Sequence, residues 1–250
     1  FTHPHLAKYL IAVGLVAFGD DNVTGTAQLA GPISDALVET RWSPDDQPGQ
    51  RDGDRFYTAT PAGVVAYDLA TRAEVATIPL PGGHVPVRLA LDAISHQLYV
   101  GDTAGGLWVI QTGELDAMRA SSSAPVPVAV SGGSFGAAPT AMAVASDDSQ
   151  VVAITTGHQL VSIDTSDGST SASVADPAAT AVIAVPATAA PGLMAVAEGA
   201  DLDMRDPASL ASERTVTLPE AATGLVYMDG TGQPTVYAAG GSTLSWIQPE

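Results

Sequence analysis

Cysteine is missing from this 250-residue sequence, and basic residues are scarce. Without cysteine the chain can form no disulfide, no thiolate metal site and no cysteine nucleophile. Nine lysine and arginine residues stand against 27 aspartate and glutamate residues, which gives a formal net charge of −18. A chain of this charge is repelled by phosphate backbones and has no basic stripe to hold it on an anionic membrane surface. We therefore expect no nucleic-acid partner.

Long apolar runs are also missing, although 46% of the residues are hydrophobic and can fill a packed core. The longest run, residues 9–19, would span about 16 Å as a helix, against roughly 30 Å of membrane hydrocarbon. We expect no complete transmembrane helix in this sequence. No signal peptide is visible, because no basic segment precedes an apolar one at the start. The sequence begins with Phe1, and we expect it to be a piece of a longer protein.

The charge pattern changes near residue 22. All aspartate and glutamate residues lie from Asp20 onward, and Lys8 is the only lysine. The segment 1–22 predicts a short amphipathic or apolar helix, which Thr2 or His3 can cap. Two interpretations stay open for it: a helix packed on a protein core, or a helix that lies at a membrane interface.

The rest of the sequence repeats itself with a period near 42 residues. Each unit has a short apolar strand, a second strand that ends in small residues, and a third strand. The third strands end at residues 68, 111, 164, 206 and 248, so the spacings are 43, 53, 42 and 42 residues. The long spacing contains a segment rich in Ser, Pro and Gly, residues 121–139, which predicts an extended loop.

A period of 40 to 45 residues with three or four strands per unit is typical of a β-propeller, because each small sheet buries its faces only against neighbouring sheets. The predicted fold class is therefore all-β, a β-propeller of about five visible blades. The predicted blades are residues 33–82, 84–131, 138–177, 179–219 and 221–250. No outer strand follows residues 246–248, so we expect further blades beyond Glu250, or a chain cut at that point.

Part of the first two units also resembles a known repeat. In residues 63–101, a strand that ends at Asp68 leads to residues 75–80 and then to the Leu-Tyr-Val of residues 98–100. This order resembles the YVTN-type propeller repeat. The resemblance implies a fold and leaves the function open, because propellers serve many functions.

A second resemblance concerns the N-terminal segment. Residues 3–14 read His-Pro-His-Leu-Ala-Lys-Tyr-Leu-Ile-Ala-Val-Gly, and residues 18–20 read Phe-Gly-Asp. This resembles the protein O-mannosyltransferase family, whose pattern is His-Pro-Pro-Leu-x-Lys-x-Leu-Ile-x-x-Gly followed by Phe-Gly-Asp. His5 replaces the second proline of the pattern. After Asp21 the family continues into an arginine and a transmembrane helix, which this sequence lacks.

The resemblance implies a membrane glycosyltransferase that uses a lipid-phosphate-linked sugar. It implies that segment 1–22 lies on the extracytoplasmic face of the membrane, held through flanking helices that are absent here. His3 and Lys8 would line the sugar-phosphate site, where Lys8 would offer a point charge to phosphate. The family's catalytic acidic residues precede the His-Pro pair, so we expect no catalytic residue in this chain and no activity from it alone.

These observations favour a fragment of a membrane-bound glycosyltransferase with an extracytoplasmic propeller that recognises a protein or glycan acceptor. Two alternatives stay open. One is a secreted or cell-surface propeller that acts as a binding scaffold without enzymatic activity. The other is a propeller enzyme such as a sugar-lactone hydrolase, with a metal ion in its central channel.

Acidic pairs and histidines complete the list of candidate sites. The acidic groups are Asp20-Asp21, Asp45-Asp46, Asp52-Gly53-Asp54, Asp147-Asp148 and Asp164-Thr165-Ser166-Asp167-Gly168. None has the alternating oxygen ligands and closing glutamate of a calcium loop, so turn formation explains them better. His3 and His5 are two residues apart and would point to different helix faces, while His84, His96 and His158 fall at turns of different blades. We therefore expect no metal site, no cofactor and surface roles for the three blade histidines.

Overall fold

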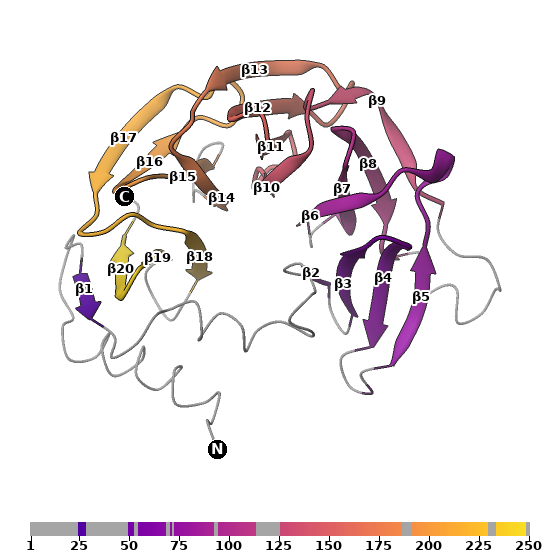
Figure 1. Ribbon diagram of the computed structural model, residues 1–250, viewed down its shortest axis with the longest axis horizontal. Helices are drawn as coiled ribbons and strands as arrows, with labels where there is room; N and C mark the ends of the chain where they lie inside the picture. Colours follow the sequence, from indigo (N-terminus) through magenta and orange to yellow (C-terminus); the bar gives the residue numbers. More distant parts are fainter. Residues whose placement is uncertain are drawn as a thin grey trace.

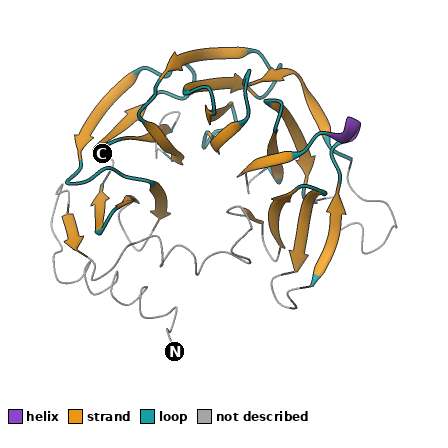
Figure 2. Ribbon diagram, viewed as in Figure 1, coloured by secondary structure: helices purple, strands orange, loops and turns teal. Residues whose placement is uncertain are grey.

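The computed structural model describes residues 25–28, 50–52, 55–68, 71, 73–92, 95–113, 126–186, 192–229 and 234–248. These residues form twenty β-strands, which build five antiparallel sheets of four strands each, and a 3₁₀ turn at Pro81–Gly83 (Figures 1 and 2). The sheets stand side by side in an arc around a common centre. The predicted all-β propeller is confirmed. The predicted helix 1–22 lies outside the described residues, and the described part contains no helix long and apolar enough to cross a membrane.

The sheets are numbered here in chain order, and their strands run from the centre of the arc outward (Figure 1). The first contains β2 (Gln50–Asp52), β3 (Arg55–Thr60), β4 (Gly63–Asp68) and β5 (Glu74–Ile78), and the second contains β6 (Pro86–Asp92), β7 (Gln97–Asp102), β8 (Gly106–Gln111) and β9 (Val128–Ser134). The third contains β10 (Pro139–Val144), β11 (Gln150–Thr155), β12 (Gln159–Asp164) and β13 (Thr170–Ala175). The fourth contains β14 (Ala179–Val185), β15 (Leu193–Glu198), β16 (Asp201–Arg205) and β17 (Ser212–Thr217), and the fifth contains β18 (Gly224–Asp229), β19 (Pro234–Gly240), β20 (Thr243–Ile247) and β1 (Gly25–Gln28).

The middle strands read as continuous apolar runs because both faces of each sheet are covered. Every residue of β11 is buried, whereas most residues of the outer strand β13 are exposed. A strand that is covered on both faces, like β11, is stabilised by apolar side chains on both faces. It therefore lacks the alternation of apolar and polar residues that is typical of a half-exposed strand. The predicted second and third strands of all five units are strands in the structure.

Four apolar clusters hold the five sheets together, one at each junction between consecutive sheets. Tyr57 and Leu98 meet between the first and second sheets. Leu160 and Met194 meet between the third and fourth sheets. All four of these residues are 0% exposed. The apolar area buried at each junction stabilises the packing of neighbouring sheets. No sheet is therefore an independent folding unit.

The fifth sheet takes its outer strand from the beginning of the chain. Strand β1 pairs antiparallel with β20, with Gly25 opposite Trp246 and Gln28 opposite Thr243. The sequence prediction began the propeller at residue 33 and left the last unit without an outer strand. The structure instead fills that edge with residues from upstream of the predicted start, which pairs the otherwise open edge of β20.

The sequence predicted an extended loop for the Ser-, Pro- and Gly-rich segment 121–139. That prediction is wrong for part of the segment, which forms a strand. Residues 128–134 form β9, the outer strand of the second sheet, which pairs with β8 and shifts register between Gly106 and Trp108. An outer strand needs one neighbour only, and most β9 side chains are exposed. Small polar residues with poor intrinsic β-propensity are therefore tolerated there.

The antiparallel topology places the turns on two opposite faces of the arc. Face A is defined by the connections that follow the first and third strands of each sheet, such as residues 145–149 and 165–169. Face B is defined by the connections that follow the second strand and those that lead to the next sheet, such as residues 103–105 and 176–178. Side chains from different sheets meet on these two faces, so they are the places to look for a site.

Candidate functional site

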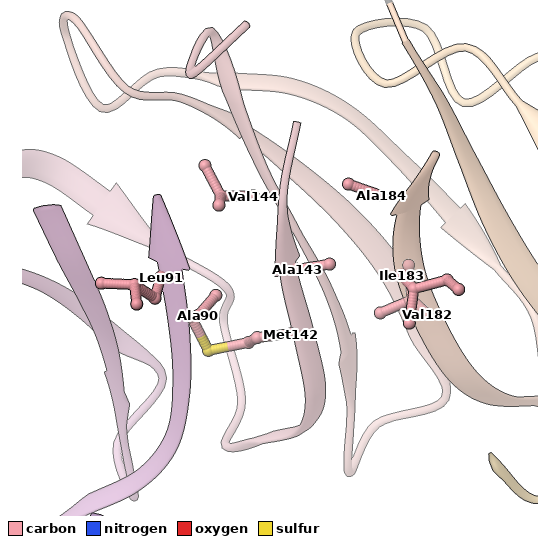
Figure 3. Close-up of a pocket in the computed structure, with 8 residues that line it drawn as sticks. All are labelled: Ala90, Leu91, Met142, Ala143, Val144, Val182, Ile183 and Ala184. Atoms are coloured by element: carbon pink, nitrogen blue, oxygen red, sulfur yellow. The ribbon is translucent and has the colours of Figure 1, made fainter. Parts of the chain in front are cut away.

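A pocket of about 190 Å³ lies against the inner strands of three sheets (Figure 3). Strands β6, β10 and β14 supply its lining. The lining residues are Ala90, Leu91, Met142, Ala143, Val144, Val182, Ile183 and Ala184. All eight side chains are apolar, so this wall can accept an apolar group and offers no side-chain nucleophile, general base or metal ligand.

Aspartate side chains fix the turns of face A. Asp147 Oδ1 accepts hydrogen bonds from the Ser149 backbone N–H at 3.1 Å and the Ser149 hydroxyl at 2.7 Å. Asp164 Oδ1 accepts the same pair from Ser166, at 2.8 and 2.6 Å. In the next sheet, Asp206 Oδ1 accepts from the backbone and hydroxyl of Ser209 at 2.7 Å each. These repeated turns hold the face A loops in defined conformations.

A buried aspartate organises face B of the second sheet. Asp102 is 0% exposed. Its Oδ1 accepts hydrogen bonds from the Ala104 and Gly106 N–H groups at 2.8 Å each. Its Oδ2 accepts one from Trp108 Nε1 at 2.8 Å and lies 2.6 Å from His84 Nδ1. The histidine and indole rings also pack at a centroid distance of 5.0 Å.

These four donors decide the charge of Asp102. Burial alone would raise the pKa of this carboxyl, but the hydrogen bonds from Trp108, Gly106 and Ala104 and the charge of His84 together outweigh burial. The pKa of Asp102 therefore lies below its ordinary value of 3.8. All four carboxylate interactions are made within the second sheet and its entry, so this group acts as a structural anchor.

A tyrosine joins the second and third sheets on face A. The Tyr99 hydroxyl lies 2.8 Å from Asp148 Oδ1 and 2.8 Å from Gln97 Oε1. Burial raises the pKa of Tyr99 well above its usual range, and the hydrogen bond to Asp148 and its charge add to this. Burial raises the pKa of Asp148 as well, with a smaller contribution from the charge of Asp92. Tyr99 stays protonated and acts as a hydrogen-bond donor between the sheets.

Asp147-Asp148 and the segment from Asp164 to Gly168 lie at turns, as predicted, whereas Asp52 is the last residue of strand β2. Asp148 has a φ of 59°, and the 164–168 segment closes with a hydrogen bond from the Gly168 N–H to the Asp164 carbonyl. Groups of three or more acidic or histidine side chains that could hold a metal ion are absent from the described residues. Asp20-Asp21, Asp45-Asp46 and Asp54 lie outside the described residues, as do His3, His5 and Lys8.

The three blade histidines lie at separate places, and the structure does not bring them together. His96 and His158 are exposed and have positive φ values of 55° and 56° at tight turns. His84 is also exposed, with 40% of its side chain accessible, yet it binds Asp102. No sequence pattern had indicated this contact or a role for Asp102 and Trp108. Their place in one repeat unit was the available signal, but only the fold brings the three side chains together.

Comparisons with solved structures identify the fold. With 15% identity and a TM-score of 0.60, the chain is similar to the BBS1N structure solved in complex with ARL6DN, over 93% of this chain and 67% of that one. It is similar to a chain of the Mitotic Checkpoint Complex at 13% identity and a TM-score of 0.56, over 82% and 65%. It is similar to Saccharomyces cerevisiae Sqt1 at 11% identity and a TM-score of 0.55, over 78% and 55%.

These likenesses show the β-propeller fold alone, because the identities are low. The chain spans between about half and two thirds of the length of the solved chains it matches. The sequence matches no protein-family model. It also matches no curated protein.

Proposed function

We propose that the propeller is a recognition module that binds a protein partner through its loop faces and has no catalytic function of its own. The observation that carries this proposal is the set of aspartate-fixed turns on face A, which present rigid loops on a core already filled by the sheet junctions. Rigid loops bind with little loss of conformational entropy. Two of the structurally similar propellers were solved in complexes, with ARL6DN and within the Mitotic Checkpoint Complex, which supports a protein as the partner.

The net charge of −18 favours a partner surface that carries positive charge. Opposite charges accelerate encounter, and salt screens them, so we expect binding to weaken as salt rises. Arg55 and Arg205 are held in ion pairs and do not offset the exposed carboxylates of Asp147 and Asp167.

Site-specific photo-crosslinking tests which surface binds. A photoreactive amino acid placed at Ala73 or Ala208, which are exposed on face A and held in their turns through backbone atoms, is expected to give a discrete cross-linked product with a partner in cells that express the whole protein. The same group at Glu213, exposed on the outer strand β17, is the matched control and is expected to give none. Mass spectrometry of the products checks the result. Equal labelling from all three positions, or no product from face A, would contradict the proposal.

A second function rests on the resemblance of residues 3–20 to the protein O-mannosyltransferases. In this proposal the propeller belongs to a membrane-bound glycosyltransferase, lies on the extracytoplasmic face and recognises a protein or glycan acceptor. His3 and Lys8 would then bind the lipid-phosphate-linked sugar. The alternative is a secreted or cell-surface scaffold without enzymatic activity.

Transfer assays on membranes that contain the whole protein separate these alternatives. We expect Lys8→Ala to abolish sugar transfer from a lipid-phosphate donor, because a phosphate loses its cationic partner. Deletion of residues 25–248 is expected to change the range of acceptors and leave donor hydrolysis measurable. If the whole protein transfers no sugar, the scaffold alternative holds. If the deletion leaves both acceptor range and rate unchanged, the propeller has no part in acceptor recognition.

A further inference from the structure

One guanidinium at the junction of the third and fourth sheets is surrounded by carboxyl groups. Arg205 NH2 lies 2.7 Å from Glu198 Oε1, and Arg205 Nε lies 3.0 Å from both Glu198 Oε1 and Asp203 Oδ2. Arg205 NH1 donates to the Leu210 carbonyl at 2.9 Å. Asp176 comes from the connection between the two sheets, and its Oδ2 lies 3.5 Å from Arg205 NH2. Three carboxyl groups thus share one positive charge.

All four side chains are largely shielded from water. The exposed fractions are 13% for Arg205, 19% for Glu198, 9% for Asp176 and 6% for Asp203. Carboxylates held this close in a poorly solvated place cannot all stay ionised beside a single cation without a large electrostatic cost. Either a further cation or a proton must reduce the negative charge.

The hydrogen bonds show where a proton would fit. Asp203 Oδ1 is satisfied by the Ser212 and Thr215 hydroxyls, at 2.5 and 3.0 Å. Asp176 Oδ1 is satisfied by the Ala178 and Ala179 N–H groups, at 3.2 and 3.1 Å. Asp176 Oδ2 is buried and accepts no hydrogen bond from the described residues, although Arg205 NH2 lies 3.5 Å from it. A protonated Glu198 is the neighbour that can donate to this oxygen.

We propose that Glu198 retains a proton and donates it in a hydrogen bond to Asp176, so that the junction between the third and fourth sheets works as a pH-sensitive latch that tightens on acidification. In the closed latch the Glu198 carboxyl O–H donates to Asp176 Oδ2, while Glu198 Oε1 still accepts from Arg205. On deprotonation the proton passes to solvent, and two carboxylates then face each other across the junction.

The raised pKa of Glu198 agrees with this arrangement. Burial raises the pKa of Glu198 above its ordinary value of 4.5; the hydrogen bond and charge of Arg205 oppose the rise, and Asp176 adds to it. The folded state then binds a proton at pH values where the unfolded chain has released it. The stabilisation is complete below the ordinary pKa of glutamate and is lost as pH rises through the higher folded value.

Other charged groups that face the latch come from both sheets. On the fourth sheet, Asp201 lies directly opposite Glu198 in the β15–β16 register, and it adds negative charge. On the third sheet, His158 supplies its backbone carbonyl to the Asp176 N–H. The acidic neighbours favour retention of the proton.

The Glu198→Gln variant tests the latch, because the amide keeps the shape and donates an N–H to Asp176 at every pH. The unfolding midpoint of the wild-type chain is expected to fall between about pH 5 and about pH 8, and that of E198Q to fall by less over the same range. Glu213→Gln removes the same charge from an exposed position of the same sheet and is expected to follow the wild type. If E198Q and E213Q show the same pH dependence, the latch does not exist.

Carboxyl ¹³C NMR of the folded wild-type chain tests the same point without a variant. The Glu198 resonance is expected to titrate above the ordinary glutamate value of 4.5. In the Asp176→Asn variant the Glu198 transition is expected to move to lower pH, because the carboxylate that retains the proton is gone. Titration of Glu198 at or below 4.5 in the wild type would overturn the proposal even if both variants failed to fold.

Discussion

The Asp102→Asn variant is expected to lose about 2–3 kcal/mol of unfolding free energy. Asp102 Oδ1 accepts from two backbone N–H groups, and Oδ2 accepts from Trp108 Nε1 and contacts His84 Nδ1. An asparagine keeps one acceptor oxygen, so its NH₂ group must face one of the two donor pairs. Since the residue is 0% exposed, no water can replace the lost acceptor. Chemical denaturation at neutral pH measures the loss.

Asp147→Asn is the matched control, since it makes the same chemical change in an exposed turn. We expect it to change the free energy of unfolding by about 0.5 kcal/mol or less. Similar losses in the two variants would show that the four donors around Asp102 contribute little to stability.

At acidic pH we expect a smaller difference in the free energy of unfolding between the wild type and Asp102→Asn. The folded pKa of Asp102 lies below its ordinary value of 3.8. Its ionisation therefore stabilises the fold above that value, and the contribution is lost as pH falls through the lower folded pKa. The asparagine cannot titrate. The stability difference at about pH 6 is expected to exceed that at about pH 2, and an equal difference at both would contradict this electrostatic account.

The Gly168→Ala variant is expected to lose about 2–4 kcal/mol, because two costs act together. Gly168 lies in the β12–β13 turn with a φ of 74°. A Cβ at this position would lie 2.8 Å from the Gly133 backbone N and closer still to the Ser131 carbonyl oxygen. Both atoms belong to β9 of the second sheet, so the side chain would push apart the third sheet and its neighbour. Thermal and denaturant unfolding measure the effect.

Gly199→Ala isolates the conformational part of that cost. Gly199 has a φ of 61° in the β15–β16 turn, and an added Cβ would meet no atom within 4 Å. We expect a loss of about 1 kcal/mol from the left-handed backbone alone. The excess loss in Gly168→Ala reports the contact between the two sheets. Equal losses would mean that the β9 backbone moves aside at no cost.

Most of the fold could be predicted from the sequence because the signals are local. Apolar runs such as residues 151–154 recur at a nearly constant spacing, and a strand buried on both faces needs such a run wherever it lies in the chain. The aspartate turns were predictable for the same reason, since Asp147 and Asp164 bind atoms within two residues of themselves. Strand β9 was missed because its Ser- and Gly-rich sequence has low β-propensity, and only its pairing with β8 makes it a strand.

The sequence by itself determined the all-β class, the repeat near 42 residues and the acidic character, because each depends on composition or on neighbours in the chain. Only the tertiary structure decided that Gly25–Gln28 closes the fifth sheet, that His84 and Trp108 meet on Asp102, and that Asp176 and Glu198 converge on Arg205. These contacts join residues from different strands and sheets, and no local propensity encodes them. They form because stacking the sheets buries their apolar faces, and that packing fixes which polar side chains are left together at the junctions.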